Sequence, residues 1–380
     1  DSGIFVIYAK KPALVLAPME GVTDAPMRRW MTARGGFTHC VSEFVRVSQD
    51  VLSKRTLREF VPELLNGART LSGTPVQVQL LGGDPELLAQ SAVVACEMGS
   101  PGVDLNFGCP VPKVTRKGGG AALPFKRRLF ASIVKNAVDA AKPYGIPVTV
   151  KMRIGIDSDH KTYLEAADAA ADAGVAWVAL HARTAAQMYE GKADWSAIAT
   201  LKEHLRPKGI PVLGNGDIWS GQDGVRMVQE TGCDGVVVGR GCLGRPWLFK
   251  DLVNSFAGSD ERYLPTLFEV REVMYRHGEL IVEYFESEER GCKDLRKHMA
   301  WYLKGFTVPR EIRSGLGMVA SYGELEYLLD QLDDQPYPQA VSENPRGRRS
   351  HGRTPTLPDG WLKDPDEIPA ITIDDSVSGG

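Results

Sequence analysis

A cysteine that could do chemistry lies in the string NFGCP at residues 106–110, directly after an apolar run. A thiol with an ordinary pKa of about 8.5 is mostly protonated at neutral pH, so it can deliver a proton to a carbon atom held against it. A nucleophilic pairing of Cys109 with His181 is the rival hypothesis, although no acyl-transfer signature accompanies these residues. Taken by itself, Cys109 could be an acid, a nucleophile or a packing residue.

Two stretches of the chain are strongly basic, although the whole protein has a net charge of −3. The first, residues 113–128, contains no acid, and its Gly-Gly-Gly triplet would let a loop close over a bound base. Its cations are Lys113, Arg116, Lys117, Lys126, Arg127 and Arg128. The second, residues 290–313, holds seven cations, with Arg296 and Lys297 near its centre. Such patches can neutralise RNA phosphates, and solvated helix faces are the alternative.

Two glycine-rich loops follow apolar runs late in the sequence, GNGD at residues 214–217 and GRG at 239–241. Glycine lets backbone N–H groups approach an anion closely, and a following helix N-terminus favours negative charge. Arg240 would add a charge-assisted contact. Either loop alone could be a tight turn, but the two together predict a site for a phosphate-bearing ligand.

Polar side chains at the ends of other apolar runs suit a flavin ring. Gln79 offers an amide for the ring edge, and Lys151 offers a cation near the N1/C2 carbonyl region, which becomes anionic on reduction. His181 and Arg183, in the string HART, can donate hydrogen bonds to pyrimidine carbonyl oxygens or to a phosphate. A lone lysine or histidine at such a position is more often solvated or structural. The flavin hypothesis therefore depends on all of these positions converging.

The elements that must bring these residues together are eight short runs rich in valine, isoleucine and leucine. They cover residues 14–18, 38–45, 76–81, 102–106, 147–152, 177–181, 212–215 and 235–239. Most are continuously apolar, as are parallel strands covered on both faces. Helical stretches between them include residues 85–98, 130–141 and 163–173. Eight strand-helix units in about 240 residues predict an α/β protein with a closed (β/α)8 TIM barrel, and an open doubly wound sheet is the alternative.

The rest of the chain predicts a second, smaller unit. Residues 1–11 are a lead-in, residues 12–258 form the predicted barrel, and residues 259–334 are expected to be an all-helical domain. Helices are expected there at 267–285, 295–306 and 322–332. Residues 335–380 are rich in Pro, Gly, Ser, Arg and Asp and poor in aliphatic side chains, so we expect a disordered tail.

The sequence also predicts the cellular setting. No apolar stretch approaches the roughly 18 residues that a membrane span requires, and residues 1–11 lack the pattern of a secretory signal. The six cysteines show neither the CxxC spacing of a zinc site nor the density of a disulfide framework, so we expect no metal and a reducing cytoplasm. If a strand joins Cys233 to Cys242, about 30 Å separates them, too far for a disulfide.

Several motifs together resemble one enzyme family, the tRNA-dihydrouridine synthases, and its bacterial B-type branch in particular. The resemblance covers residues 12–332, and the NFGCP string with the KGGG loop after it is its most specific part. The motifs are APMEGVTD at 17–24, SEFV at 42–45, VQLLG at 78–82, DLNFGCPVPKV at 104–114, KGGGAAL at 117–123, VKMRIG at 150–155, HART at 181–184, GNGDI at 214–218 and VGRG at 238–241.

The resemblance implies an FMN cofactor reduced by NADPH or NADH, hydride transfer from flavin N5 to uracil C6, and protonation of C5 by Cys109. The implied cofactor contacts are Pro18, Met19, Glu20, Gln79, Lys151, His181, Asn215, Gly216, Asp217, Gly239 and Arg240. The implied substrate contacts are Asn106, Lys117 and Arg183 near the uridine, with Arg296 and Lys297 on a helical domain that grips tRNA. The resemblance also implies a monomer whose substrate base leaves the tRNA stack.

Two other functions stay open from the sequence. A dihydroorotate dehydrogenase-like flavoenzyme would share the barrel, FMN and pyrimidine redox chemistry, but would act on a free small molecule. The helical domain and the basic residues 113–128 favour a tRNA substrate over that alternative. A barrel that binds RNA without catalysis is the other function, and the intact Cys109 and Lys151 speak against it.

Overall fold

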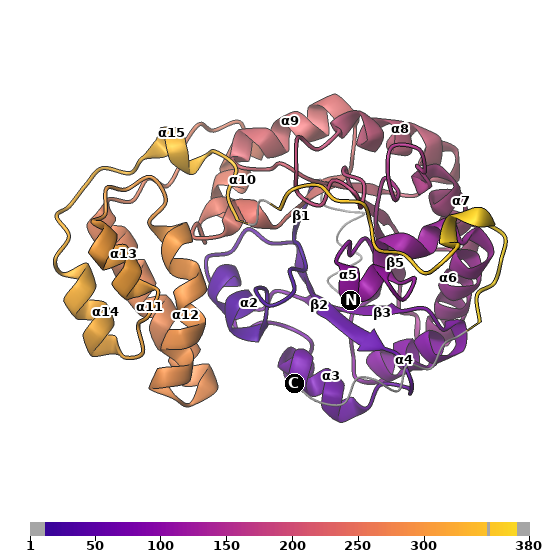
Figure 1. Cartoon of the computed structure of the whole chain (residues 1–380), viewed down its shortest axis with the longest axis horizontal. Coiled ribbons are helices and arrows are strands. Elements are labelled where there is room, and N and C mark those ends of the chain that lie inside the picture. The colour runs from indigo at the N-terminus through magenta and orange to yellow at the C-terminus, as the bar shows by residue number, and fades with distance from the viewer. Residues whose placement is uncertain (1–11, 348–349, 371–380) are drawn as a thin grey trace.

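The computed structural model describes residues 12–347 and 350–370, and eight parallel strands within them close into a barrel (Figure 1). The strands are β1 (Ala13–Leu16), β2 (His39–Val47), β3 (Val76–Gly82), β4 (Val103–Phe107), β5 (Val148–Arg153), β6 (Val178–His181), β7 (Val212–Asn215) and β8 (Gly235–Val238). Each strand pairs with the next in sequence, and β1 pairs with β8, Ala13 opposite Gly235 and Leu16 opposite Val238. The closed barrel is confirmed, and the open sheet is excluded.

The strands are buried along most of their length because both of their faces are covered. One face points into the barrel, where Val15, Trp177 and Val237 belong to a buried cluster, and the other packs against the surrounding helices. At the seam between β1 and β8, a Cβ atom on Gly235 would collide with the backbone of Ala13. Glycine therefore permits the close approach that closes the ring.

Helices follow the strands and surround the barrel (Figure 1). They are α2 (Ala25–Thr32), α3 (Lys54–Phe60), α4 (Pro85–Glu97), α6 (Arg127–Ala141), α7 (Tyr163–Ala173), α8 (Trp195–Leu205), α9 (Gly221–Thr231) and α10 (Leu248–Phe256). Capping residues set several of their starts: the Asp84 side chain accepts from two N–H groups of the first turn of α4, and Ser220 and Asp223 form a capping box on α9. The three helices predicted between strands are confirmed as α4, α6 and α7.

Helices after the barrel form the second unit (Figure 1, orange). They are α11 (Leu267–Phe285), α12 (Glu288–Tyr302), α13 (Arg310–Leu316) and α14 (Tyr322–Leu329). They share a buried core around Met274, Leu295 and Leu325. Three of them were predicted, whereas α13 was missed because its seven residues bury only Ile312 and Leu316, too few for an apolar period to be recognised.

The helical unit is attached to α2 of the barrel through a buried polar cluster. Trp30 Nε1 donates to the hydroxyl oxygen of Tyr302 at 2.9 Å, and this hydroxyl donates to Nδ1 of His277 at 2.7 Å. The rings of Trp30 and His277 stack with their centroids 5.0 Å apart. Burial lowers the pKa of His277 well below its ordinary value, so the imidazole is neutral and Nδ1 can accept the bond.

The segment after the helical unit differs from the prediction. Residues 335–347 and 350–370 lie against the rest of the protein and contain the short helix α15 (Gln339–Ser342) and the turn η7 (Trp361–Lys363). Trp361 is 7% exposed and Arg346 is 3% exposed. The disordered tail was expected because aliphatic side chains are scarce, but one tryptophan and a network of polar contacts replace them. The expectation is therefore wrong for these residues.

Smaller expectations concern the cysteines, membrane spans and the two ends of the chain. Cys233 and Cys242 are both free thiols, as expected. Among the described residues, no helix is both long and apolar enough to cross a membrane. The lead-in predicted at 1–11 and the end of the predicted tail, residues 371–380, lie outside the described part of the chain.

We predict that Tyr302→Phe destabilises the protein by about 1–3 kcal/mol, because it leaves the buried N–H of Trp30 and Nδ1 of His277 without their shared partner. Urea unfolding followed by circular dichroism would measure the change in the free energy of unfolding. The matched control is Tyr327→Phe, since Tyr327 is 71% exposed and its replacement should change stability by less than about 0.5 kcal/mol. Equal stability of the two variants would contradict the role assigned to the cluster.

Candidate active site

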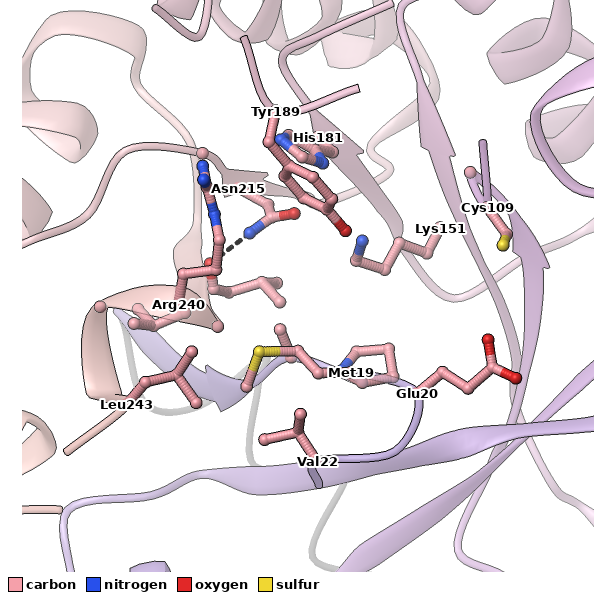
Figure 2. A pocket seen from close by; sticks show the side chains of 18 of the residues that line it. Met19, Glu20, Val22, Cys109, Lys151, His181, Tyr189, Asn215, Arg240 and Leu243 are labelled. Carbon is pink, nitrogen blue, oxygen red and sulfur yellow. Dashed lines mark hydrogen bonds between the residues drawn. The ribbon is translucent and has the colours of Figure 1, made fainter. Parts of the chain in front are cut away.

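A cavity of about 390 Å³ opens at the carboxyl ends of the strands, where loops from both halves of the barrel meet. Active sites of such barrels are built at this end. Of the residues singled out in the sequence, the wall contains Pro18, Met19, Glu20, Asn106, Cys109, Lys151, His181, Asn215, Gly216, Asp217, Gly239, Arg240 and Lys297. Figure 2 shows Lys151 in the middle, with Cys109 on one side and Asn215 and Arg240 on the other.

Cys109 is held by its neighbours in the turn after β4. The side-chain oxygen of Asn106 accepts hydrogen bonds from the N–H groups of Gly108 and Cys109, both at 3.0 Å. Burial raises the pKa of the Cys109 thiol above its ordinary value, which keeps the thiol protonated at neutral pH. His181 lies on the far side of Lys151 (Figure 2), where its Nε2 is 3.3 Å from the guanidinium of Arg183. The geometry therefore favours an acid over a cysteine–histidine nucleophile.

A buried hydrogen-bond network lies beneath the cavity and fixes the side chain of Asn106. Asn106 Nδ2 donates to Oε1 of Gln79 at 3.1 Å, and Nε2 of Gln79 donates to the carboxylate of Asp104 at 2.7 Å. Thr149 donates to the other oxygen of that carboxylate at 2.6 Å. Burial raises the pKa of Asp104 to about 6. The network supports the turn that holds Cys109, and both ends of the Gln79 amide are occupied within it.

Cations are buried together in the cavity wall. Burial, and next the charge of Arg153, lowers the pKa of Lys151 to about 8. Burial, and next the charge of Arg183, lowers the pKa of Arg240 to about 10. The pKa of His181 is lowered well below its ordinary value by burial and by the nearby cations, so this side chain is neutral. A bound anion would offset the repulsion among these groups, so the wall suits a negatively charged ligand.

The glycine-rich loops after β7 and β8 face these cations. Gly216 has a φ of +129°, and a Cβ atom added to it would lie 2.7 Å from Cβ of Ala193. A Cβ atom added to Gly239 would lie 3.2 Å from Sδ of Met19. Side chains at these two positions would crowd the corner of the cavity, whereas glycine leaves the backbone accessible to a ligand. With Arg240 beside it, this corner has the shape and charge that a phosphate cradle requires.

Four of the predicted site residues do not line the cavity. Gln79 lies in the network beneath it, and Lys117 is exposed on the loop that follows Cys109. Arg183 is buried outside the wall and donates to the carboxylate of Asp217 at 2.8 Å. Arg296 donates to two main-chain carbonyls just after α13. Motifs and basic stretches give the positions of these residues along the chain, but they do not show which protein groups engage them.

The wall also contains residues that the sequence analysis did not single out, among them Arg153, Tyr189 and Trp219. The position of Arg153 could have been found, because it lies two residues after Lys151 and side chains two apart share one face of a strand. Tyr189 has no such signal. Its ring lies 5.3 Å from the guanidinium of Arg153 and 4.6 Å from that of Arg240, and so joins the two cations across the cavity.

A known protein family matches this chain over both the barrel and the helical unit. The family model of the dihydrouridine synthases (Dus) matches residues 15–340. The chain belongs to the dihydrouridine synthase family. Residues after 340 lie beyond the matched region, so the segment that packs against the barrel rim is an addition to what this family model describes.

Similar proteins carry the family name over nearly the whole chain. This dihydrouridine synthase family member is 51% identical over 389 residues to the probable tRNA-dihydrouridine synthase of Mycobacterium leprae, an alignment that covers 96% of this chain and 100% of that one. It is 46% identical over 369 residues to the probable tRNA-dihydrouridine synthase of Mycobacterium tuberculosis H37Rv, and this alignment covers 97% of this chain and 94% of that one. The tRNA-dihydrouridine(16) synthase of Aquipseudomonas alcaligenes is 40% identical over 247 residues, and this alignment covers 65% of this chain and 77% of that one.

We predict that Lys151→Met makes the ligand-free protein more stable at pH 7, by on the order of 3 kcal/mol, because the change removes a buried charge. The folded pKa of about 8 lies below the ordinary value of 10.5. The free-energy cost of burying the charged Lys151 is therefore fully present below pH 8, and it disappears as the pH rises from 8 to 10.5. Urea unfolding of both proteins at pH 7 and pH 10 would measure the stability gained by Lys151→Met and show whether this gain shrinks at the higher pH.

The control for this prediction is Lys142→Met, because Lys142 is exposed outside the cavity and its replacement should leave stability nearly unchanged at both pH values. A Lys151→Met protein that is less stable than the parent at pH 7, or a difference that does not shrink by pH 10, would contradict the uncompensated charge assigned to Lys151.

Proposed function

We propose that this chain is a tRNA-dihydrouridine synthase that reduces the C5–C6 double bond of a D-loop uridine, with FMN as cofactor and NADPH or NADH as reductant. The single observation that carries the proposal is that Cys109 and Lys151 open on one cavity. Lys151 lies on β5 and Cys109 lies in the turn after the adjacent strand β4, in a chain whose family match spans the barrel. The relatives named above as tRNA-dihydrouridine synthases support the same activity.

FMN fits the donor set of the cavity. The bare backbone at Gly216 and Gly239, together with Arg240, would hold its phosphate. Lys151 would lie beside the part of the ring that becomes anionic on reduction, since it is the central cation of the wall. The other residues proposed around the cofactor are Pro18, Met19, Glu20, His181, Asn215 and Asp217. When bound, FMN supplies from its N5 the hydride that C6 of the uracil accepts.

Cys109 would deliver the second hydrogen, as a proton, to C5 of the uracil. Burial keeps its thiol protonated, and the bonds from Asn106 fix the main chain that carries it. The S–H bond breaks as the new C5–H bond forms, and the thiolate then regains a proton from solvent. A protonated thiol fits this role better than a nucleophilic one, because burial raises the pKa of Cys109 and His181 lies on the far side of Lys151.

The helical unit borders the cavity through α12, which contributes Lys297 and Trp301 to the wall. A uridine must leave the tRNA stack to reach a site this deep in the barrel rim, and a cationic border would hold the phosphates on either side of it. Lys117 is exposed, and Lys297 lies in the cavity wall. Protein groups already accept hydrogen bonds from both Lys297 and Arg296, so a phosphate would have to compete with Gly21 and Asp294 for Lys297 and with two main-chain carbonyls for Arg296.

We predict that Cys109→Ala retains bound flavin and its yellow colour but loses about 10²- to 10⁴-fold in the rate of tRNA reduction, the usual contribution of a positioned general acid. The measurement is single-turnover reoxidation of the reduced flavin by unmodified tRNA, with dihydrouridine counted by mass spectrometry. The matched control is Cys96→Ala, since Cys96 lies on α4 away from the cavity and its change should leave the rate intact. Normal turnover by Cys109→Ala would remove the thiol from the mechanism.

The pH dependence gives a further test of the acid. A proton donor must be protonated, so the contribution of Cys109 to the rate should hold through neutral pH and fall only as the pH rises past the thiol pKa, separately from any loss as Lys151 loses its charge near pH 8. Because burial raises that pKa, the fall in rate should lie above the ordinary thiol range.

Free uridine and orotate, offered in place of tRNA, separate the proposed activity from that of an enzyme of free pyrimidines. Reduction of either at the rate seen with tRNA would favour the latter.

A further inference from the structure

The segment of residues 343–347 and 350–370, named the strap here, crosses the rim of the barrel (Figure 1, yellow). It leaves the helical unit after α15 and passes the loop after β8, where Arg346 donates to the carbonyl oxygen of Leu243 at 2.7 Å. It then passes the loop after β6, where the N–H of Arg353 donates to the carbonyl oxygen of Ala186 at 2.8 Å. The strap therefore touches the same ring of loops that forms the cavity.

Trp361 fixes the strap to the loop after β4, which is the loop that carries Cys109. Its indole Nε1 donates to the carbonyl oxygen of Ala122 at 2.9 Å, and its ring packs against Ala122 and Ile156. The ring also covers Gly118, where an added Cβ atom would lie 2.5 Å from it. The glycine triplet was expected to be free to close over a base, but its first residue lies under a tryptophan.

The residues between these two contacts support the main chain of Cys109. The N–H of Ala121 donates to the carbonyl oxygen of Cys109 at 2.9 Å. A Cβ atom on Gly120 would collide with that same oxygen, so the two segments are in direct contact. The residues that Trp361 touches thus flank the residues that touch Cys109. A shift of the loop under Trp361 would be passed to the thiol over a distance of one or two residues.

Ion pairs hold the strap beside this contact. The buried side chain of Lys126 donates to the carbonyl oxygen of Asp364 at 2.7 Å and to the carboxylate of Glu367 at 3.0 Å. Arg127 donates to the two carboxylate oxygens of Asp366 at 2.5 and 2.7 Å. Two cations of the basic stretch 113–128 are therefore engaged by the strap, which corrects their expected use as RNA contacts.

We propose that Trp361 is a positioning residue for Cys109. By covering Gly118 and bonding to Ala122, it holds residues 118–122 in the conformation that supports the main chain of the cysteine. The catalytic consequence rests on the proposed function, in which the thiol must meet C5 of the uracil. The claim that Trp361 positions the thiol does not rest on the proposed function, because it concerns only the placement and accessibility of the thiol.

The test of the positional claim is alkylation of the full-length protein, with its cofactor bound, by iodoacetamide at pH 8. Mass spectrometry of the cysteine peptides gives a separate rate for each thiol. In Trp361→Ala the rate at Cys109 should rise about tenfold, which corresponds to about 1.4 kcal/mol less resistance to opening of the loop. Four other buried thiols serve as internal controls, namely Cys40, Cys96, Cys233 and Cys292, whereas Cys242 is left out because it lies near Arg346 of the strap.

Two further variants make the test specific. Trp361→Phe keeps a ring against Gly118 but loses the bond to Ala122, so the rate at Cys109 should rise only about twofold to threefold. Ile368→Ala changes an exposed apolar side chain of the same strap and should leave the rate unchanged. If Trp361→Ala does not fold, Trp361→Phe decides: an increase confined to Cys109 supports the proposal, and an unchanged rate overturns it.

Other outcomes are equally decisive. An unchanged rate at Cys109 in Trp361→Ala, or a rise shared by all the thiols, would show that Trp361 gives only general stability and would overturn the proposal. In turnover, kcat should fall about tenfold with KM for tRNA and flavin content unchanged, whereas a rise in KM alone would indicate an RNA-binding role instead. If the parent protein forms no dihydrouridine, the proposed function fails, but the alkylation rates still decide the positional claim.

Discussion

The closure of the barrel at the β1–β8 seam is the constraint on which the rest of the site depends. Gly235 lets the first and last strands come within pairing distance, and the ring is then complete. Because the strands of a closed parallel ring all point the same way, their carboxyl ends form one circular rim. Side chains as far apart in sequence as Met19 and Arg240 meet there. In an open sheet of the same strands, the first and last loops would lie at opposite edges.

The rim concentrates positive charge in a protein whose net charge is −3. Lys151, Arg153 and Arg240 share one wall, and each has a lowered pKa because it is buried near other cations. Keeping such charges out of water costs stability, and a bound anion offsets part of that cost. The cavity therefore gains affinity for an anion from relief of repulsion as well as from direct contacts, and the carboxylate of Asp104 in the network beneath it offsets part of the charge of Lys151.

Periodicity predicted the barrel and placed the strand-end residues on one rim, whereas other residues of the cavity wall, such as Glu20, were expected from the resemblance to the family. Continuous apolar runs indicate strands covered on both faces, and the residues just after them must lie on one rim once the ring closes. The cavity wall differs from the expected one where a tertiary partner decides the position of a side chain. Gln79 sits at the expected strand but bonds Asp104 and Asn106 beneath the cavity, and Arg183 is engaged by Asp217. The packed segment after residue 335 depends on surfaces that composition alone does not reveal.

The contact between Trp361 and the loop at Gly118 also fixes an order of events during translation. A ribosome makes the chain from its N-terminus, so the loop that carries Cys109 is synthesised more than 200 residues before Trp361, and the last barrel strand, β8, more than 100 residues before it. Until the strap emerges, the apolar surface at Ala122 and Ile156 has no cover, and the loop has only its own contacts. The nascent barrel can therefore be complete in its strands while the turn around its reactive thiol still awaits a late-synthesised tryptophan.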